Sequence, residues 1–176
     1  MIRISGGDFR SRLLKTPNTD LTKPTMDKVR LGVFSAINER IINADVLDLF
    51  AGCGSYGFEA LSRGAKSATF IDNGYEQVNV IKENASNLNV NINVYLKDSL
   101  SFLNECPYKY DVIFCDPPYK LDVYEKVVDI ILQKELLNDF GIIVLESERE
   151  LNIDESKFSK VKMYKYGLSK VYLLRK

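Results

Sequence analysis

The chain is organised around residues 46–57, which read VLDLFAGCGSYG. The stretch opens with four apolar residues that suit a strand buried on both faces, namely Val46, Leu47, Leu49 and Phe50. A G-x-G-x-x-G turn into a helix is then completed by Gly52, Gly54 and Gly57. Because glycine lets the backbone approach a ligand closely, the stretch predicts a nucleotide-like ligand but leaves the chemistry open.

Alternating strands and helices are predicted from residue 45 onward. The predicted strands cover residues 46–50, 68–72, 92–96, 111–115 and 141–146, and the predicted helices cover residues 57–63, 75–88, 100–104 and 123–134. Repeated βα units of this kind predict an α/β fold with a parallel sheet covered on both faces. A final antiparallel hairpin is predicted from residues 157–166 and 168–174, on either side of Gly167.

A smaller unit precedes this core. Residues 1–14 are predicted to form a β-hairpin that turns at Gly6 and Gly7, followed by a proline-containing loop. Asp27 is a plausible N-cap for a helix that runs to about residue 42, and Gly32 inside that helix indicates close packing. We therefore expect a single folding unit with an N-terminal extension, residues 1–44, and a core, residues 45–176.

Length and composition exclude several classes of protein. At 176 residues and 45% apolar, the chain is expected to form one globular domain, and it has no apolar run of the ~18 residues that a membrane span needs. The N-terminus does not resemble a signal peptide. Three cysteines are scattered and histidine is absent, which argues against zinc sites and histidine-based catalysis. The simplest expectation is a cytoplasmic, reduced, metal-free monomer.

The net charge is zero, but the charges are unevenly distributed along the chain. Residues 1–40 carry a balance of +4 and residues 157–176 a balance of +7, so the middle of the chain carries −11. Basic ends around an acidic centre suggest that a polyanion contacts the ends while a cationic or polar ligand is held centrally. Ordinary solvated lysines would explain the C-terminal charges equally well.

Acidic residues stand at or near the ends of four consecutive strands: Asp48, Asp72, Asp98 and Asp116. Ligands of doubly wound sheets bind beyond the carboxyl ends of the strands. Asp72 follows Gly52 by twenty residues, a spacing suited to binding ribose hydroxyls. Asp48 would oppose a pyrophosphate and would suit an ammonium or sulfonium group, so S-adenosylmethionine is the predicted cofactor. Asp98 could accept a hydrogen bond from the adenine amine.

The tetrapeptide Asp116-Pro117-Pro118-Tyr119 follows an apolar strand directly. Proline has no N–H group, so the prolines stiffen the chain without adding a donor. An Asp carboxylate and a neighbouring carbonyl can together accept both protons of an exocyclic NH2 group. The ring of Tyr119 offers a face on which a base can stack. These features predict methyl transfer to an amino group of a base.

At this point the sequence resembles a known family. DLFAGCG followed by DPPY resembles class I methyltransferases that act on amino groups. Residues 4–7 (ISGG), 23–30 (KPTMDKVR) and 59–65 (EALSRGA) are similar to the RsmD family of bacterial 16S ribosomal RNA guanine-N2 methyltransferases. The segment KPTMDKVR is the specific part of this resemblance, which covers essentially the whole chain.

The resemblance implies a Rossmann-like fold with a seven-stranded, mostly parallel sheet, S-adenosylmethionine as methyl donor and one guanine as target. The implied partner is 16S ribosomal RNA or a small-subunit assembly particle. By the same comparison the cofactor would be held by Asp48, Phe50, Gly52, Gly54, Asp72 and Asp98, and the base by residues 116–119. Leu31 and Cys53 depart from the residues frequent in the family, which weakens residue-level assignments on the helix that would face the RNA.

A mechanism follows from these assignments. Asp116 and a proline carbonyl would orient the NH2 group and stabilise the positive charge that grows on it, and the proton would leave to Asp116 or to water. A duplex would hide the base, so the base must be single-stranded or flipped out. The candidates for phosphate contacts are Arg10, Arg12, Lys23, Lys28 and Arg30.

Three other functions share some of these features. A DNA adenine-N6 or protein-glutamine methyltransferase would use a similar x-P-P-Y motif. A nicotinamide-dependent oxidoreductase would use G-x-G-x-x-G, but the charge of Asp48 and the absence of histidine and of a second domain count against it. A non-catalytic RNA-binding module could keep the fold, but it would not need the DPPY motif, so the intact motif argues against it.

Overall fold

The computed structural model describes residues 1–18, 24–118 and 120–176. Its centre is a seven-stranded sheet in the order β5-β4-β3-β6-β7-β9-β8. The five parallel strands are β3 (Asp45–Leu49), β4 (Ser67–Asp72), β5 (Asn93–Leu96), β6 (Tyr110–Cys115) and β7 (Leu137–Ser147). The hairpin of β8 (Lys160–Tyr166) and β9 (Ser169–Arg175) joins through β9, which pairs antiparallel with β7. The predicted seven-stranded, mostly parallel sheet with an antiparallel hairpin is confirmed.

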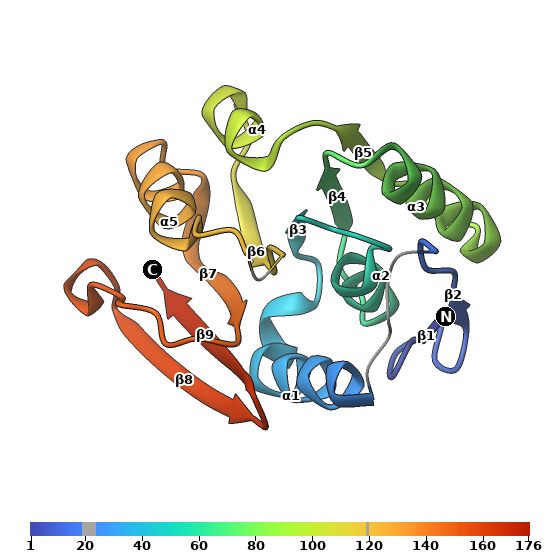
Figure 1. The fold of residues 1–176 in the computed structure, drawn as a ribbon, viewed down its shortest axis with the longest axis horizontal. Helices are drawn as coiled ribbons and strands as arrows, with labels where there is room; N and C mark the ends of the chain where they lie inside the picture. Colours follow the sequence, from blue (N-terminus) through green and yellow to red (C-terminus); the bar gives the residue numbers. More distant parts are fainter. Residues whose placement is uncertain (19–23, 119) are drawn as a thin grey trace.

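Helices cover both faces of this sheet. They are α1 (Pro24–Ile41), α2 (Ser55–Ser62), α3 (Tyr75–Leu88), α4 (Ser99–Glu105) and α5 (Tyr124–Gln133), with a 3-10 turn, η1 (Glu155–Lys157), before β8. Figure 1 shows α4 and α5 on one side of the central strands and α1 and α2 on the other. A small separate sheet pairs β1 (Ile2–Arg3) with β2 (Leu13–Leu14), as expected for the N-terminal hairpin.

Strand alternation divides the core into two apolar layers. On β6, Ile113 and Cys115 pack toward α4 and α5, while Val112 and Phe114 pack toward α1 and α2. Successive side chains of a strand point to opposite faces, so both faces of a central strand must be apolar when helices cover both. This requirement explains the continuous apolar runs of β3, β6 and β7.

The largest differences from the predicted boundaries are at the starts of α1 and β7. The first long helix begins at Pro24, so Asp27 lies in its first turn and is not its N-cap. Proline is favoured at the first helical position because its missing N–H group would be unsatisfied there in any case. Strand β7 begins at Leu137 instead of residue 141, with Phe140 in a left-handed conformation (φ 62°) just before Gly141.

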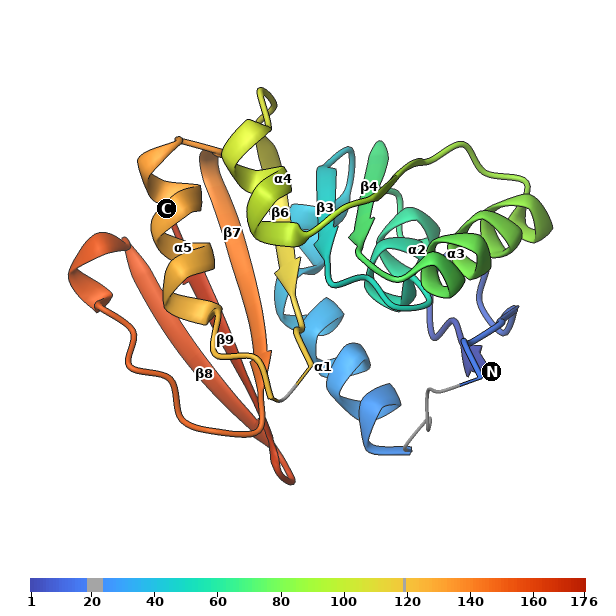
Figure 2. The same cartoon turned by 45° about the horizontal axis from the view of Figure 1, so that its top comes forward.

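The carboxyl ends of the parallel strands define one edge of the sheet. Figure 2 shows the ends of β6 and β7, the start of α1 and the β8–β9 turn on the same lower side of the molecule. The register agrees, since the last residue of β7, Ser147, pairs with Lys170 at the start of β9. Residues far apart in the sequence therefore meet where ligands of such sheets bind.

Gly57 in α2 illustrates how tightly this region is packed. A Cβ atom added to Gly57 would overlap the ring of Phe70 on β4. We expect Gly57→Ala to lower the free energy of unfolding by about 1–3 kcal/mol, because overpacking outweighs the better helix propensity of alanine. Urea unfolding measures this, with Ser35→Ala on the exposed face of α1 as the control; equal stability of Gly57→Ala and the wild type would contradict the packing argument.

Candidate functional site

Three buried or half-buried carboxylates lie on one face of the sheet near its carboxyl edge. Asp48 on β3 is in register with Phe114 on β6, which is in register with Val144 on β7. Continuing the alternation by two residues brings Asp116 and Glu146 to the same face, which α1 and α2 cover. Asp48, Asp116 and Glu146 thus form a group that we call the carboxylate row.

Asp48 lies under the glycine turn. It is 3% exposed, and its carboxylate accepts a hydrogen bond from the backbone N–H of Gly57 at 2.9 Å. Burial raises the pKa of Asp48 to about 8, against the effect of the Gly57 bond and with a smaller contribution from the charge of Asp72. A cation beside this carboxylate would favour its ionised form.

Asp72 at the end of β4 holds the turn in place. Its two oxygens accept hydrogen bonds from the N–H groups of Gly52 and Gly74, both at 2.8 Å. Gly52 and Gly54 have positive φ angles of 58° and 81°, and Phe50 adopts the left-handed region as well at 56°. Left-handed residues other than glycine are strained and cluster at functional sites. The turn is therefore built to a specific shape, with a strained residue directly after β3.

The charges around the turn decide which ligand it suits. Asp48 lies beneath the turn and Asp72 beside it, so two carboxylates border the place where a G-x-G-x-x-G turn would otherwise bind a pyrophosphate. This pair of acidic acceptors repels a phosphate and fits a ligand that carries ammonium and sulfonium groups and ribose hydroxyls. The residues present therefore fit S-adenosylmethionine.

Asp98 has a structural task that the sequence left open. It is exposed and caps α4, where its Oδ1 accepts hydrogen bonds from the backbone N–H and the hydroxyl of Ser101, at 2.9 and 3.0 Å. Its place after β5 puts it at the same edge of the sheet as Asp72. A role toward an adenine amine stays a prediction.

Asp116, Pro117 and Pro118 follow β6 as expected. Asp116 is half-buried, Pro117 is buried and Pro118 is exposed. The carbonyl of Pro118 accepts a hydrogen bond from the N–H of Leu121 at 2.8 Å, so a turn already engages it. Pro117 is therefore the better candidate for the carbonyl that acts with Asp116. Tyr119 lies outside the described residues.

Burial and neighbouring charges raise the pKa of Asp116 well above its ordinary value. Burial is the largest cause, followed by the charges of Glu146 and Asp48. Glu146 is itself 7% exposed, and burial raises its pKa too, although hydrogen bonds from Tyr56 and Ser169 lower it. Like charges at close range cannot all ionise freely, which is common at catalytic sites.

Glu146 and its partner Tyr56 were not predicted from the sequence. The hydroxyl of Tyr56 on α2 donates a hydrogen bond to Glu146 at 2.6 Å, and both side chains are buried. An acid at the end of an apolar strand was a usable signal, because residues 141–146 end in Glu146 just as residues 111–115 lead to Asp116. The pairing of β6 with β7 is what brings them together.

The predicted RNA-contacting residues have different surroundings. Arg10 and Lys28 are exposed, and Arg12 is exposed while donating a hydrogen bond to the carbonyl of Asn87 at 2.6 Å. Lys23 lies outside the described residues. Arg30 corrects the prediction, because it is only 3% exposed and its guanidinium is bound to Glu59, Asp27 and the carbonyl of Arg3. A guanidinium enclosed in this way is a structural group rather than a phosphate contact.

Glu59 is the centre of this network. It is 0% exposed and accepts hydrogen bonds from the backbone and the hydroxyl of Ser5, at 2.9 and 2.6 Å, and from Arg63 at 2.8 Å and Arg30 at 3.3 Å. Burial alone would raise the pKa of Glu59, but these partners together lower it. The three segments that carried the family resemblance are therefore joined here through Ser5, Arg30 and Glu59, which attach the N-terminal hairpin to α1 and α2.

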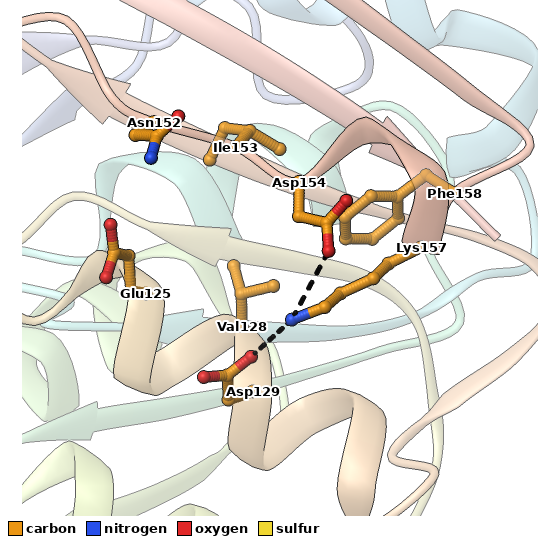
Figure 3. A pocket seen from close by; sticks show the side chains of 8 residues that line it. All are labelled: Glu125, Val128, Asp129, Asn152, Ile153, Asp154, Lys157 and Phe158. Carbon is orange, nitrogen blue, oxygen red and sulfur yellow. Dashed lines mark hydrogen bonds and ion pairs between the residues drawn. The ribbon is translucent and has the colours of Figure 1, made fainter.

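A separate cavity of about 430 Å³ lies between α5 and the segment before β8. Figure 3 shows Lys157 reaching across it to Asp129 and Asp154, with N–O distances of 3.0 and 4.0 Å. Its lining comes from residues 125–129 and 152–158 and so does not include the carboxylate row.

None of the helices in the described ranges is both long and apolar enough to span a bilayer. Within the same ranges, no group of three or more His, Cys, Asp and Glu side chains is arranged to hold a metal ion.

Comparison with known proteins identifies relatives over almost the whole chain. The family model described as conserved hypothetical protein 95 matches residues 2–175. Ribosomal RNA small subunit methyltransferase D of Escherichia coli strain K12 is 35% identical over 150 residues, which cover 85% of this chain and 76% of that protein. The corresponding Haemophilus influenzae protein is 33% identical over 154 residues, covering 85% and 80%.

Solved structures show the same fold. The Escherichia coli protein yhhF superposes with a TM-score of 0.86 at 30% identity, covering 99% of this chain and 97% of that one. A Thermus thermophilus 16S rRNA N2 G1207 methyltransferase, solved with AdoMet and guanosine, has a TM-score of 0.72 at 22% identity and covers 92% of this chain and 45% of that one. The second similarity concerns the fold alone.

Proposed function

Because the chain belongs to the RsmD family, described as conserved hypothetical protein 95, we propose that it transfers a methyl group from S-adenosylmethionine to the N2 amine of one guanine in 16S ribosomal RNA. The observation that carries the proposal is the carboxylate row at the carboxyl edge of the sheet, with Asp48 under the glycine turn and Asp116 directly after β6. The identity with ribosomal RNA small subunit methyltransferase D, at 35%, supports a ribosomal RNA substrate.

S-adenosylmethionine would supply a methyl group on a positively charged sulfur. On the side of the protein, Asp48 would face a positive charge of the donor, and the backbone of Gly52 and Gly54 would approach it closely. Phe50, Asp72 and Asp98 complete the proposed binding residues. Two carboxylates near the donor would also explain why the turn is unsuited to a pyrophosphate, which disfavours a nicotinamide-dependent oxidoreductase.

Asp116 and Pro117 would hold the target amine. The lone pair of guanine N2 is delocalised into the ring, so the amine is a weak nucleophile that must be aligned with the methyl group. A carboxylate and a carbonyl that accept its two protons fix its orientation and stabilise the developing positive charge. The ring of Tyr119 would stack on the base.

We also propose that residues 1–44 form the side of the protein that meets the RNA. Arg10, Arg12 and Lys28 are exposed on this part of the chain, and the start of α1 lies on the same side of the molecule as the end of β6 (Figure 2). Contacts to phosphates would position the RNA without reading its sequence.

Methyl transfer can be measured directly on candidate substrates. Purified protein is incubated with radiolabelled S-adenosylmethionine and with 30S particles, naked 16S RNA or duplex DNA, and the products are hydrolysed to nucleosides. The proposal expects N2-methylguanosine from the ribosomal substrates. Label in N6-methyladenine of DNA would instead support the DNA methyltransferase, and the absence of label from every substrate would support a binding module.

Affinity for S-adenosylmethionine should depend on pH through Asp48. With a pKa of about 8 in the free protein, Asp48 is mostly neutral at lower pH and must lose a proton before it can pair with a cation. As the pH rises toward 8, the affinity should therefore increase by up to about tenfold per pH unit, and it should level off above pH 8. Calorimetry in buffers of different ionisation enthalpy would detect the released proton.

The matched variants for this measurement lie at the two ends of β3. Asp48→Asn should bind more weakly and lose the pH dependence, whereas Asp45→Asn at the opposite end of the strand should keep it. An affinity that is flat from pH 6 to pH 9 in the wild type would contradict the role given to Asp48.

A further inference from the structure

Glu146 is the acid of the carboxylate row to which the proposed mechanism gives no task. Cys115 and Leu145 are partners in the β6–β7 ladder, so Asp116 and Glu146 form the next pair in register. Both follow the alternation that faces α1 and α2. The side chains of Asp116 and Glu146 therefore lie side by side at the carboxyl edge of the sheet, on the buried side of the place where the target amine would bind.

The carboxylate of Glu146 is held in one position. The Tyr56 hydroxyl donates a hydrogen bond to it at 2.6 Å, and the ring of Tyr56 stacks on Phe114 with centroids 4.8 Å apart. The side chain of Ser169 on β9 bonds to it as well. The backbone carbonyl of Glu146 accepts a bond from the Tyr124 hydroxyl at 2.8 Å. Hydroxyl donors favour the ionised form of a buried carboxylate and hold it at a defined distance from its neighbour.

We propose that Glu146 is a positioning residue for methyl transfer, whose fixed negative charge makes Asp116 the group that takes up the proton released by the methylated amine. This inference rests on the proposed function. It answers which group, Asp116 or water, accepts that proton.

Two bonds break and two bonds form during methyl transfer and proton loss. The bond between the methyl carbon and the donor sulfur breaks, its electron pair stays on sulfur, and the amine nitrogen forms the new bond to carbon. As positive charge grows on the nitrogen, an N–H bond breaks and its electron pair returns to nitrogen. The proton binds to the carboxylate of Asp116, which starts ionised and ends neutral. A neighbouring negative charge strengthens Asp116 as a base for this step.

Several charged or titratable groups surround Asp116, and they contribute differently to its pKa. The groups that face Asp116 or Glu146 are Asp48 on β3, Tyr56 on α2, Arg30 on α1, Tyr124 on α5, Cys115 on β6 and Glu148 after β7. After burial, the charge of Glu146 makes the largest contribution to the raised pKa of Asp116, and Asp48 makes the next. Removing the charge of Glu146 should therefore lower the pKa of Asp116.

The first test needs no substrate. Carboxyl carbons of aspartate are labelled with 13C, and the titration of Asp116 is followed by NMR in the wild type and in Glu146→Gln. Glutamine keeps the size and an acceptor for Tyr56 but removes the charge, so the midpoint of Asp116 should fall by at least about one pH unit. Glu150→Gln, an exposed acid four residues away, is the control and should leave the midpoint unchanged.

The second test follows the reaction. The acid limb of the kcat profile should move to lower pH in Glu146→Gln, and kcat on its plateau should fall severalfold because a weaker base accepts the proton. KM for S-adenosylmethionine and for RNA should change much less. Tyr56→Phe keeps the stacked ring but removes the hydrogen bond that favours ionised Glu146. It should therefore shift the Asp116 midpoint and the pH profile of kcat in the same direction, and it replaces Glu146→Gln as the test variant if Glu146→Gln does not fold.

The outcomes separate the two proposals. An unshifted Asp116 midpoint in both variants, or a shifted midpoint with an unchanged pH profile of kcat, would overturn the role of Glu146. A wild-type protein that transfers no methyl group to guanine would overturn the proposed function itself, whatever the midpoint does.

Discussion

Asp116→Asn is expected to lower kcat for methyl transfer by at least about a hundredfold while leaving the binding of S-adenosylmethionine within a few-fold of normal. The amide keeps the size of the side chain but turns one acceptor oxygen into an NH2 donor that would oppose the target amine. It also removes the negative charge that stabilises the developing cation, and loss of one such preorganised group typically costs on the order of 10²–10³ in kcat.

Single-turnover methylation of 30S particles measures this effect, with calorimetry of the donor as the binding control. Asp122→Asn is the matched variant, because Asp122 lies six residues further along the chain and forms an exposed ion pair with Arg149. Asp122→Asn should retain normal turnover. Near-normal turnover of Asp116→Asn with the donor bound would contradict the assignment of Asp116.

Glu59→Gln is expected to have the largest effect on stability. Glu59 is fully buried and compensates the guanidinium groups of Arg30 and Arg63, so the substitution removes the buried negative charge that both groups share and leaves Arg30 with the exposed Asp27 as its acidic partner. Breaking a buried ion pair from one side costs about 3–5 kcal/mol, which corresponds to a fall in Tm of about 6–20 °C for a domain of this size.

Urea unfolding and calorimetry test this expectation against Glu83→Gln. Glu83 forms an exposed pair with Lys15, and exposed pairs contribute about 0–1 kcal/mol. Because the folded pKa of Glu59 is lowered, its contribution is present above the unfolded pKa and is lost as the pH falls through the folded value. Glu59→Gln should therefore also lose part of the acid sensitivity of the wild type. A loss of stability no larger than that of Glu83→Gln would contradict the network.

Much of the fold could be predicted because its signals are local. The helix over residues 75–88 is found with the predicted bounds, and the predicted strands agree to within a few residues, since apolar runs bounded by glycine or polar turns reflect burial on two faces. The start of α1 was missed because an acid in a first turn and an acid at an N-cap look alike in a sequence.

The site was less accessible because it depends on which strands are neighbours. The motifs indicated Asp48, Asp72 and Asp116, but the meeting of Asp116 with Glu146 depends on the pairing of β6 with β7. Arg30 was misread for a similar reason: its buried position on α1 is fixed by a bond to Glu59, which lies 29 residues away in the chain, on α2. Residues with tertiary partners of this kind carry no periodic signal of their own.

The central claim, N2 methylation of a guanine in 16S ribosomal RNA, is tested most directly by mass spectrometry of that RNA from cells with and without this protein. We expect one N2-methylguanosine to disappear when the gene is deleted, to return with the wild-type gene, and to remain absent with the Asp116→Asn gene. A 16S modification map that is identical in the presence and absence of the protein would contradict the proposed function.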